Sequence, residues 1–235
     1  MTTYTGQDPR AVRRMFAALA PRYNLLNHLL SGCLDRSWRR SLVAALDLPD
    51  GARVLDICAG TAHLARECLR QHPRLSQIIV SDFVPEMLAL APESLRADGR
   101  VAFLGADAQR LPFGDAQFDT TMNAFGLRNT ADPAVALAEM VRVTRPGGMV
   151  AILEFFRPRP GFWRSPPGLW VRYGIPVMGK LLSPHPQAYS YLPQSLNEFM
   201  SLAECAEILR LQGCEIACQR VLSGGVAAAL VARRE

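Results

Sequence analysis

The chain has 235 residues, a hydrophobic share of 49% and a formal net charge of +5. This length suits one substantial core, so we expect a single α/β domain over 1–235 rather than two domains. Nearly all of the positive charge comes from scattered arginines, since Lys180 is the only lysine, and no long basic tract or aromatic platform is present. This pattern argues against nucleic acid as a partner.

The cysteines and histidines point away from metal binding. The six cysteines show no C-x-x-C spacing, and the four histidines form no H-x-x-x-H pair. We therefore expect no metal site and a reducing compartment. The N-terminus lacks the apolar segment of a signal peptide, and no apolar stretch is long enough to span a bilayer. These features predict a cytoplasmic protein, with a peripheral position at the inner face of the membrane as an added option because the surface is mildly basic.

Residues 9–48 are expected to form a helical N-terminal cap. Asp8-Pro9 offers a helix start, a short helix through Phe16 follows, and further helical pieces are expected over 25–30 and 36–46.

Residues 52–155 alternate between apolar, β-branched runs and helical patterns. Strands are predicted up to Asp56 and over 77–81, 101–104, 118–123 and 149–154, with helices over about 62–71, 85–91 and 133–144. Strands that alternate with crossover helices predict a doubly wound, mostly parallel sheet.

The remaining chain divides into an insertion, residues 156–198, and a closing segment, residues 199–235. The insertion mixes prolines and aromatic residues with arginines. Its apolar side chains could rest on a membrane surface, or they could cover the sheet edge or form a homodimer contact. The closing segment predicts a helix over 199–212 and strands over 215–221 and 226–232, joined at Gly224-Gly225, which would give the sheet an antiparallel edge.

Polar or small residues follow four successive predicted strands. Asp56, Gly60 and Thr61 follow the first strand, Asp82 the second, Asp107-Ala108 the third and Asn123-Ala124 the fourth. Open α/β sheets hold ligands at this edge. A single glycine in the first loop leaves few glycine amides for a pyrophosphate, which favours a cofactor without phosphates, S-adenosylmethionine. Taken alone, the first loop could also be an ordinary strand-to-helix connection that Thr61 caps.

Several strings carry a family resemblance. The motifs are Val54-Leu-Asp-Ile-Cys-Ala-Gly-Thr61, Asp82 with Met87-Leu88, Asp107-Ala-Gln-Arg-Leu-Pro-Phe113, Asp115-x-x-Phe-Asp119 and Arg145-Pro-Gly-Gly148. Together they resemble class I S-adenosylmethionine methyltransferases. Rarer strings are Arg22-Tyr-Asn-Leu-Leu-Asn27, Phe125-Gly-Leu-Arg-Asn129, Leu153-Glu-Phe155, Gly174-Ile-Pro-x-x-Gly-Lys180, Tyr189-x-Tyr-Leu-x-x-Ser195 and Gly224-Gly225. In that order they resemble the ubiquinone/menaquinone biosynthesis C-methyltransferases, from about residue 10 to residue 232.

The resemblance implies a seven-stranded Rossmann-like sheet and a set of cofactor contacts. Asp82 would bind the ribose, Asp107 the adenine amino group, and Thr61 would lie near the methionine end. The other implied cofactor residues are Tyr23, which would close over the cofactor, with Asp56, Gly60, Ala108 and Ala124. The chain departs from the family pattern Gly-Thr-Gly-Asp at Ala62 and His63, which could weaken binding, mark altered chemistry or be neutral.

The same resemblance implies C-methylation of a demethylmenaquinol or a related prenylated quinol. Arg128 is the first candidate to hold the ring hydroxyl as a phenolate, although it could equally be structural, and Glu154 could contact cofactor or substrate or cap a turn. His185 is a candidate base. Asn129, Tyr189, Tyr191 and Ser195 are candidate substrate contacts. Two alternatives are a methyltransferase for a soluble phenolic natural product and a cofactor-binding scaffold that no longer methylates.

Overall fold

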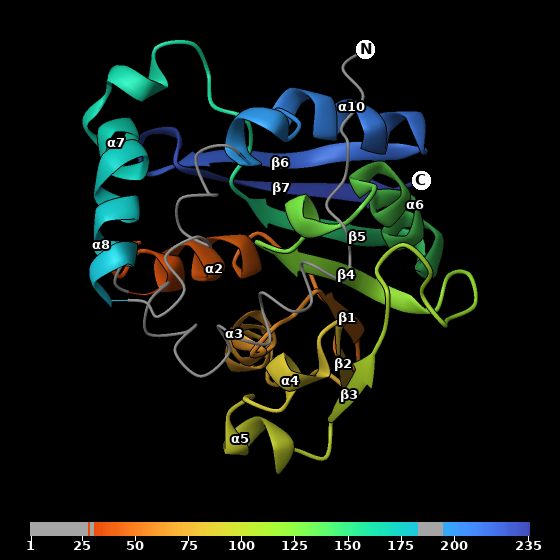
Figure 1. The fold of residues 1–235 in the computed structure, drawn as a ribbon. Helices are drawn as coiled ribbons and strands as arrows, with labels where there is room; N and C mark the ends of the chain where they lie inside the picture. Colours follow the sequence, from red (N-terminus) through yellow and green to blue (C-terminus); the bar gives the residue numbers. More distant parts are fainter. Residues whose placement is uncertain (1–27, 29–30, 183–194) are drawn as a thin grey trace.

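A seven-stranded sheet runs through the protein, as Figure 1 shows. The computed structural model describes residue 28 and residues 31–182 and 195–235. The strands lie in the order β3-β2-β1-β4-β5-β7-β6. They are β1 (Arg53–Ile57), β2 (Gln77–Asp82), β3 (Val101–Gly105), β4 (Phe118–Ala124), β5 (Thr144–Glu154), β6 (Cys214–Leu222) and β7 (Ala227–Arg234). The first five are parallel, whereas β7 pairs antiparallel with both β5 and β6, which confirms the predicted architecture.

Helices cover both faces of this sheet. The α-helices are α2 (Asp35–Val43), α3 (His63–Gln71), α4 (Pro85–Leu88), α5 (Glu93–Arg96), α6 (Pro133–Val143), α7 (Pro166–Leu169), α8 (Ile175–Leu182) and α10 (Leu202–Leu211). The other helical turns are η1 (Leu127–Asn129), η2 (Phe162–Arg164), η3 (Trp170–Gly174) and η4 (Ser223–Gly225).

Two hydrophobic cores lie on opposite sides of the sheet. One contains apolar residues of α2 and α3 together with Val54, and the other contains residues of α6 and α10 together with Leu55 and Ile57. Successive side chains of a strand point to opposite faces, so the continuous apolar run of β1 supplies both cores. This double burial explains why the strand sequences carry so few polar residues.

The strand register brings the carboxyl ends of the parallel strands to one edge. Ile57 at the end of β1 lies opposite Ser81 of β2 and Asn123 of β4, and Asp82 lies opposite Gly105 of β3. The loops that follow these strands therefore meet at the same place, which is where open α/β sheets bind ligands.

Some element boundaries differ from the predicted ones. Strand β5 begins at Thr144 instead of residue 149, because Thr144 already pairs with Phe118 and a register shift accommodates the Pro-Gly-Gly turn within the strand. The predicted helix over 85–91 ends earlier, at Leu88, and the short helix α5 was not predicted. Helix α10 begins at Leu202, because Ser201 and Glu204 form a capping box there.

The insertion contains helices that its prolines did not predict. Pro166 and Pro167 occupy the first turn of α7, where a missing N–H costs no hydrogen bond, and the Ser165 hydroxyl accepts the N–H of Gly168 at 3.2 Å. The chain then continues through η3 into α8. The helices predicted before residue 25 lie outside the described residues. Among the described residues, no helix is long and apolar enough to cross a membrane.

We expect the cap of α6 to contribute measurably to stability. The Asp132 side chain accepts the N–H groups of Ala134 at 2.9 Å and Val135 at 3.2 Å, and Pro133 follows it in the first turn. Asp132→Ala should lower the free energy of unfolding in urea by about 1 kcal/mol, whereas Asp132→Asn, which keeps an acceptor oxygen, should retain most of it. Equal stability of the alanine variant and the parent protein would contradict this role for the cap.

Candidate functional site

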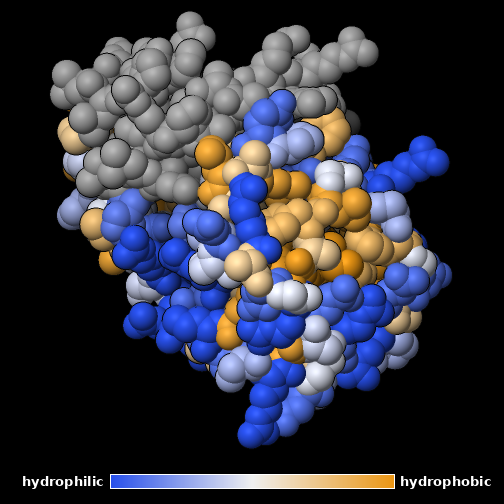
Figure 2. Space-filling view, turned by 90° about the horizontal axis from the view of Figure 1, so that it is seen from below, coloured by the Kyte–Doolittle hydropathy of each residue, from blue (hydrophilic) through white to orange (hydrophobic). Residues whose placement is uncertain are grey.

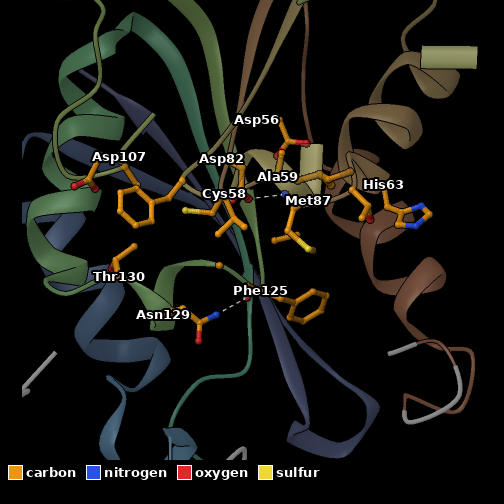
Figure 3. A pocket seen from close by; sticks show the side chains of 18 of the residues that line it. Asp56, Cys58, Ala59, His63, Asp82, Met87, Asp107, Phe125, Asn129 and Thr130 are labelled. Carbon is orange, nitrogen blue, oxygen red and sulfur yellow. Dashed lines mark hydrogen bonds between the residues drawn. The ribbon is translucent and has the colours of Figure 1, made fainter. Parts of the chain in front are cut away.

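A pocket of about 950 Å³, counting the part open to solvent, lies at the carboxyl ends of β1, β2, β3 and β4. Its lining includes seven of the predicted cofactor residues, namely Asp56, Gly60, Thr61, Asp82, Asp107, Ala108 and Ala124. In Figure 3, Asp107 lies at one side of the pocket, Asp82 near the middle, and His63 at the other side, at the start of α3. The pocket is therefore elongated along the strand ends and presents different chemistry at its two sides.

Asp82 is held in place by backbone amides. Its Oδ2 accepts the N–H of Gly60 at 2.7 Å and its Oδ1 accepts the N–H of Val84 at 2.8 Å. Burial raises the pKa of Asp82 above its usual value, while these hydrogen bonds act to lower it. Each carboxyl oxygen can accept a second hydrogen bond. The fixed carboxyl is thus able to receive two hydroxyl groups from a ligand.

Asp56 has an unsatisfied buried oxygen. The residue is fully buried, its Oδ2 accepts the N–H of Ala65 at 3.0 Å, and its Oδ1 has no hydrogen-bond partner among the residues that the structure describes. Burial raises the pKa of Asp56 to about 8, so the carboxyl is protonated near neutral pH. A buried polar atom without a partner is costly in a folded protein. Since Asp56 borders the pocket, a cationic group of a ligand beside Oδ1 would favour loss of the proton and would pair with the resulting carboxylate.

The backbone around the pocket is strained. Cys58, Ala62 and Phe125 have φ angles of 51°, 62° and 62°, in the left-handed region that non-glycine residues seldom adopt. Cys58 and Phe125 line the pocket, and Ala62 lies between the lining residues Thr61 and His63. Backbone strain of this kind tends to gather at functional sites, where the surrounding structure enforces it. Ala62 therefore keeps a conformation that suits glycine, which the resembled family pattern has at this position.

Gly126 allows the loops after β1 and β4 to approach closely. A Cβ atom at this position would lie 2.3 Å from the Cβ of Cys58 and 2.9 Å from Nδ2 of Asn123. Asn123 itself donates to the Ile57 carbonyl at 2.7 Å and accepts from the N–H of Leu127 at 3.2 Å. These contacts set the positions of the two loops that form the pocket wall.

The α3 side of the pocket carries a cation and a neutral imidazole. Arg39 of α2 and His63 both line the pocket. Burial and the nearby positive charge of Arg39 lower the pKa of His63 to about 4, so this ring is neutral at pH 7. The motifs did not single out Arg39, because its proximity to the strand ends depends on how α2 packs against α3.

Arg128 and Glu154 form an ion pair with a 2.6 Å distance between Nη1 and Oε1. Glu154 is fully buried, and its carboxylate also accepts the backbone N–H groups of Arg128 at 3.2 Å and Phe155 at 2.8 Å. The Arg128 guanidinium lies over the Phe155 ring, 5.2 Å from its centroid. The structure thus joins two predicted catalytic residues in one unit beside the pocket, and their catalytic roles stay predictions.

The other predicted contacts are distributed as follows. Asn129 lines the pocket and donates from Nδ2 to the Phe125 carbonyl at 3.3 Å. Ser195 is buried and is not among the residues that line the pocket. Tyr23, His185, Tyr189 and Tyr191 lie outside the described residues. Lining residues that the sequence did not single out include Arg39 and Thr130. Among the described residues, no group of three or more His, Cys, Asp or Glu side chains could hold a metal ion.

One face of the molecule carries an exposed apolar area. Figure 2 shows apolar side chains in an area near the middle of the face seen from below, with hydrophilic residues around it. The large apolar residues that are exposed include Phe83 at the pocket and Leu169, Trp170, Tyr173 and Val177 on α7 to α8. Apolar areas of this kind mark surfaces that meet a ligand or a partner.

Comparison with known proteins identifies the family. The sequence model of the ubiE/COQ5 methyltransferase family matches residues 3–234. The chain belongs to this family. A demethylmenaquinone methyltransferase of Deinococcus radiodurans is 41% identical, with 93% of this chain and 90% of that protein covered. The ubiquinone/menaquinone biosynthesis C-methyltransferase UbiE of Geobacter sulfurreducens is 38% identical, with 92% and 85% covered.

Solved structures share the methyltransferase fold at low sequence identity. A SAM-dependent methyltransferase of Thermotoga maritima gives a TM-score of 0.64 at 17% identity, with 95% of this chain and 100% of that chain covered. The [4+2]-cyclase SpnF gives a TM-score of 0.70 at 20% identity, with 98% and 97% covered. Because one of these proteins is a cyclase, the fold alone does not decide the reaction, and the family membership identifies this chain as a methyltransferase.

We expect the buried Asp56 carboxyl to make the stability of the methyltransferase fall as pH rises. Its pKa is about 8 in the folded protein against an ordinary value of 3.8 for an aspartate, so the folded state holds this proton more tightly than the unfolded chain does. The contribution is fully present below about pH 4 and is lost between about pH 4 and about pH 8, by at most about 1.4 kcal/mol per pH unit.

Urea unfolding over this pH range tests the expectation by comparison with Asp56→Asn, which imitates the protonated carboxyl. The variant should gain stability relative to the parent protein as pH rises. A difference between the two proteins that does not change with pH would contradict it.

Proposed function

We propose that the protein transfers the methyl group of S-adenosylmethionine to a ring carbon of a demethylmenaquinol or a related prenylated quinol. The observation that carries this proposal is the family match over residues 3–234, together with the similarity to demethylmenaquinone methyltransferases along more than nine-tenths of the chain. The strings at Phe125–Asn129 and at Leu153–Phe155, which suggested this substrate class, lie beside the pocket and next to each other.

The residues of the pocket fit a nucleoside that carries an amino acid. The Asp82 carboxyl, fixed by the Gly60 and Val84 amides, would accept the ribose hydroxyls. Asp107, at the other side of the pocket, would meet the adenine amino group. The cofactor's cationic end, placed beside Oδ1 of Asp56, would favour loss of the carboxyl proton and would then pair with the carboxylate. Small residues at positions 59, 60, 108 and 124 leave room between these groups.

When bound, the cofactor supplies a methyl group that its sulfonium already activates. The protein then has to align the ring carbon with that methyl and to assist loss of the ring hydroxyl proton. Arg128 is our candidate to stabilise the phenolate, and Glu154 would position it through their 2.6 Å ion pair. The stack of the Arg128 guanidinium on Phe155 would hold the same geometry.

We further propose that α7, η3 and α8 rest on a membrane surface that holds the prenylated substrate. Leu169, Trp170, Tyr173 and Val177 are exposed at spacings that place them along one side of this helical segment. Arg164 and Arg172 are exposed beside them. Aromatic and apolar side chains flanked by arginines suit the interface of an anionic bilayer. A homodimer contact through this segment stays the alternative.

We expect the purified protein to methylate a long-tailed demethylmenaquinol, with S-adenosylhomocysteine as the second product. Asp82→Asn should raise the KM for the cofactor by about tenfold or more, because the amide donates where the ribose hydroxyls need acceptors. Mass spectrometry of the quinone product measures the reaction. Activity on tail-less phenols alone would favour the soluble phenolic substrate, and cofactor binding without turnover would favour a scaffold, so either result would overturn the proposal.

We expect binding to anionic vesicles to depend on the exposed aromatic residues. Trp170→Ala combined with Tyr173→Ala should weaken cosedimentation with vesicles of phosphatidylglycerol and phosphatidylcholine by about tenfold. Leu211→Ala is the matched control, because Leu211 is an apolar residue of α10 that is 78% exposed. Equal binding of the aromatic variant and the Leu211 variant would contradict a membrane role for this surface.

A further inference from the structure

Arg39 presents hydrogen-bond donors to the α3 side of the pocket. Arg39 lines the pocket, and its guanidinium lies over the Phe125 ring, 5.4 Å from the ring centroid. Among the described residues, its hydrogen bonds all leave from Nη1, to Oδ2 of Asp35 at 2.6 Å and to the Asp35 carbonyl at 3.2 Å. A guanidinium has five N–H groups in a planar fork, so Nε and Nη2 keep donors for a ligand.

Asp35 holds Arg39 in this position. Its Oδ1 contacts Nδ1 of His28 at 2.7 Å, while its Oδ2 pairs with Arg39. Although burial acts to raise it, the pKa of Asp35 lies below its usual value because of the hydrogen bonds from His28 and Arg39 and the charge of Arg39. The carboxylate is therefore ionised and fixed at two points. An arginine anchored in this way loses little freedom when it binds a ligand.

The surroundings of Arg39 lack the competing carboxylate that the resembled family pattern would supply. Position 63 holds a histidine, which is neutral at pH 7 because burial and the charge of Arg39 lower its pKa to about 4. An aspartate there would be ionised close to Arg39 and would compete for its donors. The start of α3 borders the same side, and its N-cap residue, Ala62, makes no side-chain hydrogen bond. This side therefore favours a negatively charged group.

We propose that Arg39 binds the α-carboxylate of the cofactor's methionine moiety, and that His63 and Arg39 together make this chain select its cofactor by the carboxylate. The inference rests on the proposed use of S-adenosylmethionine. The ammonium of the same moiety would then lie beside Asp56, whose Oδ1 has no partner among the described residues, and would favour the ionised form of that carboxyl. Arg39 would be a specificity-determining residue for the cofactor.

Two forms of the cofactor distinguish a contact of Arg39 with the carboxylate from an effect of Arg39 on the whole pocket. Binding is measured by calorimetry with S-adenosylmethionine and with decarboxylated S-adenosylmethionine, which differs by the missing carboxylate. Arg39→Gln should weaken binding of the first ligand by about 10- to 100-fold, the range of a charge-assisted hydrogen bond. It should leave binding of the second ligand unchanged or stronger. The ratio of the two constants within one variant is independent of any loss of folded protein.

Two further variants test whether the ratio of the two binding constants depends on Arg39 itself. Arg40→Gln is the matched control, because it removes the same charge from an exposed position of the same helix and should leave the ratio unchanged. His63→Asp should shift the ratio by about tenfold toward the decarboxylated ligand, because the new carboxylate would pair with Arg39.

If Arg39→Gln weakens the binding of both ligands equally, or weakens the binding of neither, the assignment of Arg39 is overturned. A parent protein that binds neither ligand while it is folded would instead overturn the proposed function.

Discussion

The parallel pairing of β1 with β4 is the contact on which the site depends. The chain leaves β1 toward β2 and β3 on one side and returns to β4 on the other, so the order of strands reverses between β1 and β4. A crevice opens at such a reversal, because the connections on its two sides diverge. Asn123 bridges this junction by donating to the Ile57 carbonyl. The loops after β1 and β4, which form one wall of the pocket, take their positions from this pair of strands.

Burial at this junction shapes the pocket and also shifts the pKa values of the carboxyl groups in it. Asp56 and Asp82 are carboxyl groups in a region where apolar residues surround them, and burial raises the pKa of each. The left-handed conformations of Cys58, Ala62 and Phe125 add conformational strain at the same place. A ligand that satisfied the buried oxygen of Asp56 would relieve part of this cost. The fold thus stores at its crevice the free energy that ligand binding can recover.

The sequence predicts the sheet better than it predicts the surroundings of the site. Runs such as Val54–Ile57 are apolar on both faces, and this pattern has few solutions other than a buried parallel strand. Once these strands are predicted, the positions of the acidic residues at their carboxyl ends are predicted as well. Arg39 could not be predicted in the same way, because its role depends on the packing of α2 and on an ion pair with Asp35. The helices within the insertion were not predicted, because Pro166 and Pro167, which indicate a break in a helix, occupy the first turn of α7.

The ion pair of Arg128 and Glu154 shows a second limit of prediction from the sequence. Each residue was predicted from its own string, 26 positions apart, as a separate catalytic candidate. Only the adjacent ends of β4 and β5 bring the two side chains together, through the pairing of Ala124 with Leu153. A sequence motif can predict which residue lies at the end of a strand. Whether that residue forms an ion pair depends on its neighbour on the adjacent strand, which the motif does not give.

The distance in sequence between β1 and β4 has a kinetic consequence. Val54 pairs with Thr120, so the central crevice requires contacts between residues that lie 66 positions apart. Contacts of such separation form slowly, since the intervening chain must first be closed into a loop. A ligand that needs groups from four strand ends binds only after all of them have assembled. It should therefore prolong the lifetime of the folded protein by slowing unfolding, while the rate of folding stays nearly unchanged.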